Sequence, residues 1–182
     1  MEDHEATEPI EKFKYRAMAK PWSRYWSRML DIHLWSWPVT FGVAALFPAQ
    51  TNALLVYDER GYALFFLSLP LIMVVDAFCL ALLGNTPGRA IVGIRVETIR
   101  HQRLPVPIAL YRNGLVYLKG LGLGIPLVAL WTLISSVYNA SAGEQTSWDK
   151  DLYTRVYDVS SGPVRTFICA ILVAISIWAG YA

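Results

Sequence analysis

Residues 62–83 read YALFFLSLPLIMVVDAFCLALL, an apolar run in which Asp76 is the single charged residue. A helix needs roughly 20 residues to cross the hydrocarbon of a bilayer. The proline within the run, Pro70, is compatible with this because membrane helices tolerate interior prolines. The run therefore predicts a transmembrane helix and indicates an all-α membrane protein.

The composition agrees with this class. Of 182 residues, 55% are hydrophobic and 16% are charged, and the net charge is +2. This is too apolar for a typical soluble domain, and the length favours one compact unit. The two cysteines, Cys79 and Cys169, lie in apolar runs and predict buried thiols rather than a disulfide scaffold. The basic residues adjoin an apolar run, so no nucleic-acid partner is expected.

Three further runs could cross the membrane: residues 22–47, 121–138 and 166–182. Together with residues 62–83 they predict four transmembrane helices in a single domain, 22–182, preceded by a polar and interfacial segment, 1–21. The acidic start does not resemble a cleaved signal peptide. The run 121–138 begins among Gly120, Gly122, Gly124 and Pro126, so it either crosses fully or is a broken, re-entrant segment.

The basic residues also predict an orientation. They concentrate before the first run and between residues 84 and 120, whereas residues 48–61 and 139–163 hold few. Positive residues are retained on the cytoplasmic side, so both termini are expected there. If the third run returns instead of crossing, the C-terminus would lie outside.

The connection after residue 83 has its own pattern. Thr86-Pro87-Gly88 predicts a sharp turn in which Thr86 is an N-cap and Pro87 takes the first helical position. Residues 94–97 alternate apolar and charged side chains, which predicts a short β-prone cytoplasmic segment. Residues 108–118 then return to an amphipathic pattern expected near the membrane surface.

Four charged residues are candidates for a cluster inside the membrane: Arg24, Arg28, Asp31 and Asp76. The first three share one helix face, and the two aspartates reach a similar depth on antiparallel helices. A charge at the bilayer centre costs on the order of 2.5–3.5 kcal/mol, so such groups usually mark a cavity, an ion route or a buried pair.

Other readings of these residues stay open. Arg24 and Arg28 could be anchors that extend to lipid headgroups, and Asp31 could be a structural partner of an arginine. Asp76 has no basic residue in its own run. It is therefore the best candidate for a carboxylate that binds a proton or a cation.

Enzyme motifs are missing from the sequence. It contains no HExxH, GxSxG or Walker-type pattern and no paired Cys/His spacing. We therefore expect no enzyme activity, no metal and no cofactor.

Three stretches resemble the RDD family of small membrane proteins, which is named for one arginine and two aspartates. The first is Arg24-Tyr-Trp-Ser-Arg-Met-Leu-Asp31, and the second is Gly84-Asn-Thr-Pro-Gly-Arg-Ala-Ile-Val-Gly-Ile-Arg-Val96. The third is Ser147-Trp-Asp149-Lys150 followed by Thr154-Arg155-Val156. The resemblance assigns to the family motif Thr86, Pro87, Gly88, Arg89, Gly93, Asp149 and Lys150, but not Asp76.

The resemblance implies a small multi-span helical unit in a bacterial cytoplasmic membrane. Transport, including cation/proton antiport, has been proposed for some members, and others resemble accessory subunits. Two hypotheses follow: a transport module for cations or protons, or a non-catalytic accessory or assembly subunit. Four short spans enclose little space, so a homo-oligomer or another membrane protein is expected as partner, besides the lipid bilayer.

Overall fold

Helix α4 spans Tyr62–Leu83, the run that predicts a membrane helix. The computed structural model describes residues 17–58, 61–98, 100, 102–124, 149 and 151–181. Glycines in the left-handed region flank α4, Gly61 with φ 69° and Gly84 with φ 77°, and a left-handed glycine such as Gly84 is common at the C-terminus of a helix. At its start the Ala63 backbone N–H donates to Asp58 Oδ2 at 2.6 Å, which satisfies a donor that the helix itself leaves unpaired.

The first predicted run forms one helix, and a second helix follows it directly. Helix α2 spans Pro21–Leu46 and continues through Pro38, and α3 spans Pro48–Tyr57 after Phe47. The axes of the two helices differ by 114°. Pro48 explains the break, because proline disfavours the helical conformation at the residue before it and suits the first position of a new helix. The connection after residue 47 is therefore a helix, which the sequence pattern did not predict.

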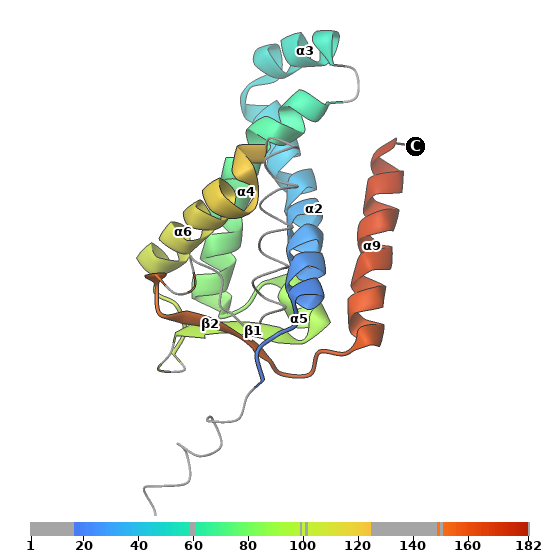
Figure 1. The fold of residues 1–182 in the computed structure, drawn as a ribbon. Helices are drawn as coiled ribbons and strands as arrows, with labels where there is room; N and C mark the ends of the chain where they lie inside the picture. The colour runs from blue at the N-terminus through green and yellow to red at the C-terminus, as the bar shows by residue number, and fades with distance from the viewer. Residues whose placement is uncertain are drawn as a thin grey trace, which may run out of the picture.

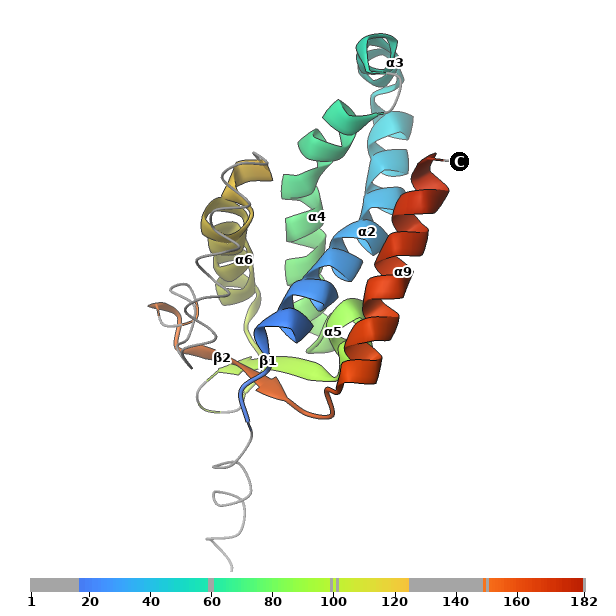
Figure 2. The ribbon, with the colours of Figure 1, turned by 45° about the vertical axis from the view of Figure 1, so that its right-hand side comes forward.

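The helices α2, α4, α6 and α9 run side by side from one end of the molecule, and α3 lies across the other end (Figures 1 and 2). Helix α9 spans Pro163–Tyr181 and packs against α2. Helix α6 spans Val106–Leu115 and continues as a π-helical turn, Val116–Gly120. It packs against α4 and buries Arg112 and Asn113, so this segment is part of the helix bundle.

A small sheet closes the end of the bundle opposite α3 (Figure 1). Strand β1, Ile94–Thr98, pairs antiparallel with β2, Thr154–Asp158, with Val96 opposite Val156. The other edge of β2 holds the residues before α2, because Ala19 N–H donates to the Val156 carbonyl at 3.0 Å. The predicted β-prone segment is thus a strand, and the expectation of an all-α fold is corrected to a mostly helical fold with a two-stranded sheet.

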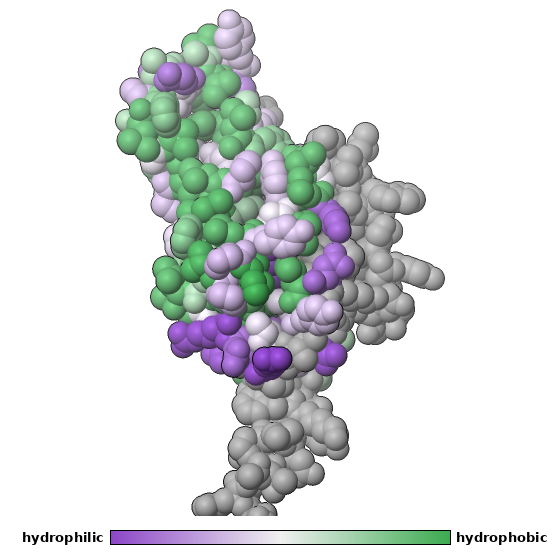
Figure 3. All heavy atoms as spheres, turned by 90° about the vertical axis from the view of Figure 1, so that its left-hand side faces the viewer, coloured by the Kyte–Doolittle hydropathy of each residue, from purple (hydrophilic) through white to green (hydrophobic). Residues whose placement is uncertain are grey.

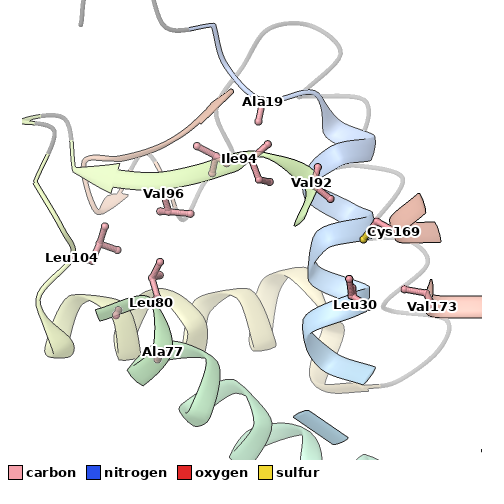
Figure 4. Close-up of a cluster of buried hydrophobic side chains, with 12 residues drawn as sticks. Ala19, Leu30, Ala77, Leu80, Val92, Ile94, Val96, Leu104, Cys169 and Val173 are labelled. Atoms are coloured by element: carbon pink, nitrogen blue, oxygen red, sulfur yellow. The ribbon is translucent and has the colours of Figure 1, made fainter. Parts of the chain in front are cut away.

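The buried apolar side chains gather where the sheet meets the helices. Figure 4 shows Ile94 and Val96 of β1 in one cluster with Leu80 of α4 and Leu30 of α2. Cys169 and Val173 join this cluster from α9. Because residues from all these elements share one core, the sheet holds the helix ends at fixed positions beneath the bundle.

The outer faces of the helices are strongly apolar. Figure 3 shows hydrophobic side chains over the helices of one face and hydrophilic side chains gathered at the end that holds the sheet. On α9, only Cys169 and Val173 are buried among its described large apolar residues, whereas Phe167, Ile171 and Ile175 are exposed. Exposed apolar faces of this extent mark contact with lipid or with another protein.

By length and composition, α4 is the one helix of the described part that alone could cross a membrane. Helices α2 and α3 pass the same criterion only as a bent pair, and the apolar part of α9 is shorter. Most of the predicted run 121–138 lies outside the described residues. Its first residues form a tight turn in which Leu123 has φ 60°.

Candidate functional site: a buried network of charges

Asp76 lies at the centre of a buried polar network. Its carboxylate is 1% exposed, and Oδ2 accepts hydrogen bonds from three side chains on three other helices. Helix α5, which supplies one of them, spans Pro87–Val92. Arg28 Nη1 of α2 lies at 2.6 Å, Asn113 Nδ2 of α6 at 2.8 Å, and Arg89 Nη2 of α5 at 3.4 Å. One carboxylate oxygen thus joins α4 to α2, α5 and α6.

Within the part of the chain that the structure describes, the other oxygen of Asp76 is unpaired. Oδ1 is buried and finds no hydrogen-bond partner among these residues, and the same is true of Arg89 Nη1. The great majority of buried polar atoms in proteins are paired, so each exception needs an explanation such as a water molecule, an ion or a functional role. The network therefore contains one free acceptor on its central acid and one free donor on an arginine bound to that acid.

Asn113 fixes the geometry around Asp76. Its Nδ2 also donates to the Met73 carbonyl at 3.0 Å, one turn before Asp76 on α4. Its Oδ1 accepts a weaker contact from Arg28 Nη2 at 3.4 Å. The Asn113 amide therefore contacts Asp76, Arg28 and the backbone of α4 at once. It helps to hold the carboxylate so that Oδ2 is the oxygen that accepts the hydrogen bonds.

Asp31 has a different partner from the one expected. It is 1% exposed, and its two oxygens accept from Thr86 Oγ1 and from the Gly88 backbone N–H, each at 2.6 Å. Thr86 occupies the N-cap position of α5, as predicted, but its side chain does not cap the helix. Asp31 of α2 supplies the cap instead, and its negative charge suits a helix N-terminus.

The contact between α2 and α5 needs a glycine. A Cβ atom at Gly88 would collide with the Ser27 carbonyl and would lie 2.9 Å from Asp31 Oδ1. Only a residue without a side chain lets α5 approach α2 closely enough for the backbone N–H to reach the carboxylate.

Arg89 belongs to both parts of the network. It is buried, donates to Asp76 and lies near enough to Asp31 to interact electrostatically. Burial and the nearby charge of Arg28 lower the pKa of Arg89 to about 10, while Asp76 opposes that change. Arg89 is therefore still cationic at neutral pH. Two guanidiniums, Arg28 and Arg89, balance two carboxylates, Asp31 and Asp76.

A second buried ion pair lies beside this network. Arg112 Nε and Nη2 of α6 contact Asp149 Oδ1 at 2.9 and 2.8 Å. Thr154 Oγ1, the first residue of β2, donates to the same oxygen at 2.9 Å. Asp149 thus connects α6 to the sheet. Lys150, which the resemblance places beside it, lies outside the described residues.

The structure brings together some of the predicted cluster and separates the rest. Arg28 and Asp76 meet, but Arg28 does not bind Asp31, its neighbour on the same helix. Arg24 donates to the Ala19 carbonyl at 2.9 Å instead of joining the two acids. The second guanidinium of the cluster is that of Arg89, not that of Arg24.

Sequence reasoning assigned no site role to Asn113 or Arg112. Their signal was present, since they form a polar pair within the otherwise largely apolar residues 108–118. The amphipathic pattern of that segment suggested a surface location and so concealed a buried role. The burial of Arg89 and Arg112 also removes both from the set of exposed basic residues on which the predicted orientation rested.

The remaining motif residues shape α5 and its junction with the sheet. Pro87 begins α5, and Gly93 ends it with φ 85°. The Gly93 carbonyl accepts from the backbone N–H groups of Val159 and Ser160, each at 3.0 Å, which ties the end of α5 to the chain after β2.

Comparison with known proteins identifies a family. A family model described as the RDD family matches residues 18–152, which include Arg28, Asp31, the α5 motif and Asp149. No curated protein and no solved structure matches the chain. The match covers well over half of the sequence, and the chain belongs to the RDD family.

Proposed function

We propose that this RDD-family protein lies in a bacterial cytoplasmic membrane, with its N-terminal end and the sheet in the cytoplasm. Because β1 pairs with β2 and the start of α9 lies beside the start of α2, the run 121–138 would return to the sheet side and the end of α9 would lie on the opposite side of the membrane. This is the alternative orientation that the sequence left open. The length and apolarity of α4, together with the exposed apolar faces of α9 and α2, support this placement. The sheet end would be cytoplasmic, because it carries the exposed cations Arg95, Arg100, Arg103 and Arg155. Helix α3 would lie at the opposite membrane surface.

The proposed activity is transport of protons or cations, with Asp76 as the carboxylate that binds them. The observation that carries this proposal is the unpaired oxygen of Asp76, buried beside Arg28 and Arg89. An acid held inside the bundle with one oxygen free can accept a proton or a cation while its other oxygen stays fixed. In membrane proteins, buried ionisable groups of this kind mark ion pathways and proton relays.

A homo-oligomer or another membrane protein would complete the walls of the pathway, since four short helices enclose little space. No enzymatic step and no cofactor are part of the proposal.

The test is ion flux in proteoliposomes that contain a trapped pH indicator. Wild-type protein is expected to change the internal pH when a Na⁺, K⁺ or H⁺ gradient is imposed. Asp76→Asn should abolish this change. Asp151→Asn is the control, because it also removes one carboxylate but at an exposed position, where Asp151 pairs with the exposed Lys119.

Folding must be established for both variants before the flux is compared. Each should elute from gel filtration as a single species, like wild type. Wild-type protein that is folded and moves none of these ions, or Asp76→Asn protein with undiminished flux, would overturn the proposal.

An accessory or assembly role is the second candidate. The outward face of α9, with Phe167, Ile171 and Ile175 exposed, favours it because a partner helix could cover this face. Purification in mild detergent should then retain a stoichiometric membrane partner. A folded oligomer that conducts ions without any partner would count against this role.

A further inference from the structure

The ends of three helices at the sheet side share a feature that the charge network does not use. Each carries an exposed cation next to exposed apolar side chains. Lys20 precedes Trp22 at the start of α2, and Arg165 lies between Val164 and Phe167 at the start of α9. Arg103 lies against Gly84 at the end of α4, where a Cβ atom would be 3.0 Å from its Nε.

These cations are available for an external ligand. Among the described residues, no acidic side chain pairs with Lys20, Arg103 or Arg165. Arg165 donates to Ser160 Oγ at 2.6 Å, which orients its guanidinium without neutralising the charge. The arginines of the sheet, in contrast, have an acidic neighbour. Glu97 Oε1 lies 3.8 Å from Arg95 Nη1, and Glu97 is opposite Arg155 in the strand register.

The neighbouring apolar residues define the other half of the ligand. Leu82 and Leu83, next to Gly84, are exposed, as are Trp22, Val164 and Phe167. A molecule that contacts both groups needs a negative head and an apolar tail in contact with the outer helix faces. Cations near a membrane surface attract anionic headgroups, and tryptophan favours the headgroup level.

We propose that the sheet-side helix ends form a binding surface for anionic phospholipids, with the headgroup phosphates on Arg103, Arg165 and Lys20. The proposal rests on the membrane placement proposed above and is independent of the transport role. Each cation that contacts an anionic lipid surface changes the affinity by about fivefold.

The test uses the full chain in detergent, titrated with phosphatidylglycerol or with phosphatidylcholine of the same acyl chains. The concentration that gives half of the maximal thermal stabilisation is measured. Arg103→Gln/Arg165→Gln is expected to raise this concentration for phosphatidylglycerol by about 25-fold. The matched control, Arg95→Gln/Arg155→Gln, also removes two exposed arginines and should leave it close to the wild-type value.

Arg103→Lys/Arg165→Lys, which preserves both charges, should bind nearly as well as wild type. Equal losses in the Gln variant and its control would show general electrostatic attraction and overturn the proposal. So would equal stabilisation by the two lipids, or by glycerol phosphate without acyl chains. A chain that stays soluble and monomeric without detergent would instead contradict the membrane placement, so the two failures are distinguishable.

Discussion

Asp76 places its two oxygens in very different surroundings: Oδ2 accepts from Arg28, Arg89 and Asn113, and Oδ1 has no partner among the residues that the structure describes. Hydrogen bonds to charged groups contribute roughly 1.5–3 kcal/mol each, while an unpaired buried polar atom costs roughly 1–3 kcal/mol. The network therefore combines strong fixation of the carboxylate with one unsatisfied position. That combination suits a carboxylate that must stay in place and still accept a proton or a cation.

At the residue scale, Asn113→Ala tests this fixation. The substitution removes the contacts to Asp76 and to the Met73 carbonyl and should lower the free energy of unfolding by about 1–3 kcal/mol. Denaturant unfolding in detergent measures the change. Asn52→Ala, at an exposed position of α3, is the control and should stay within about 0.5 kcal/mol of wild type. Equal effects of the two substitutions would show that Asn113 has no special role.

The members of the site could be predicted only in part at this scale. Asp76 stands out because it is the single charge in an apolar run, which is a local signal. The partners of each charge depend on how separate helices pack, and no local pattern contains that information. Arg28 and Asp31 are close enough along α2 to pair, yet the structure directs them to Asp76 and to α5.

At the scale of elements, the short helix α5 depends on its contact with α2. Its N-terminus is capped by Asp31, and its approach requires Gly88. A six-residue helix has little stability of its own, so this contact determines its position. The α5 position in turn places Arg89 beside Asp76.

Gly88→Ala should therefore be strongly destabilising. The added methyl group collides with the Ser27 carbonyl and crowds Asp31, so we expect a loss of about 1–3 kcal/mol. The matched substitution is Gly114→Ala on helix α6, where the added methyl group would find open space, with nothing within 4 Å. It should be neutral or stabilise by up to about 1 kcal/mol. Thermal unfolding of both variants in one detergent compares them, and a harmless Gly88→Ala would contradict the close contact.

Elements with strong local signals were predicted, and those defined by tertiary contacts were not. The bounds of α4 follow from apolar length and from the glycines at both ends, and β1 follows from alternation. Strand β2 was not predicted because a strand of this length is stabilised by pairing with a partner strand, and its partner β1 lies far away in the sequence, with Thr154 opposite Thr98. The amphipathic pattern of residues 108–118 did not reveal that Arg112 and Asn113 of α6 are buried against other helices.

At the scale of the whole molecule, the sheet links segments that are distant in sequence. Residues 17–19, β1 and β2 lie together, and α9 follows directly after β2. The starts of α2 and α9 also meet through Ser23 Oγ and Thr166 Oγ1 at 3.1 Å. The sheet end and α3 therefore lie at opposite ends of the bundle, and the proposed orientation places them on opposite sides of the membrane.

Cysteine labelling in intact cells tests this orientation. In a chain with Cys79 and Cys169 replaced by alanine, a cysteine at Asn52 of α3 should react with a membrane-impermeant maleimide. A cysteine at Gln102, which is exposed at the sheet end, should react only after the cells are lysed. The reverse pattern would place the sheet outside, and labelling of both positions in intact cells would argue against a membrane between them.

The central claim is that Arg28 and Asp76 form a buried pair that joins α2 to α4, and a double-mutant cycle measures it most directly. The unfolding free energies of wild type, Arg28→Gln, Asp76→Asn and the double variant give the coupling between the two side chains. We predict a coupling of about 1.5–3 kcal/mol, with the double variant more stable than the sum of the single losses implies. A coupling near zero, with additive losses, would contradict the pair and the network built on it.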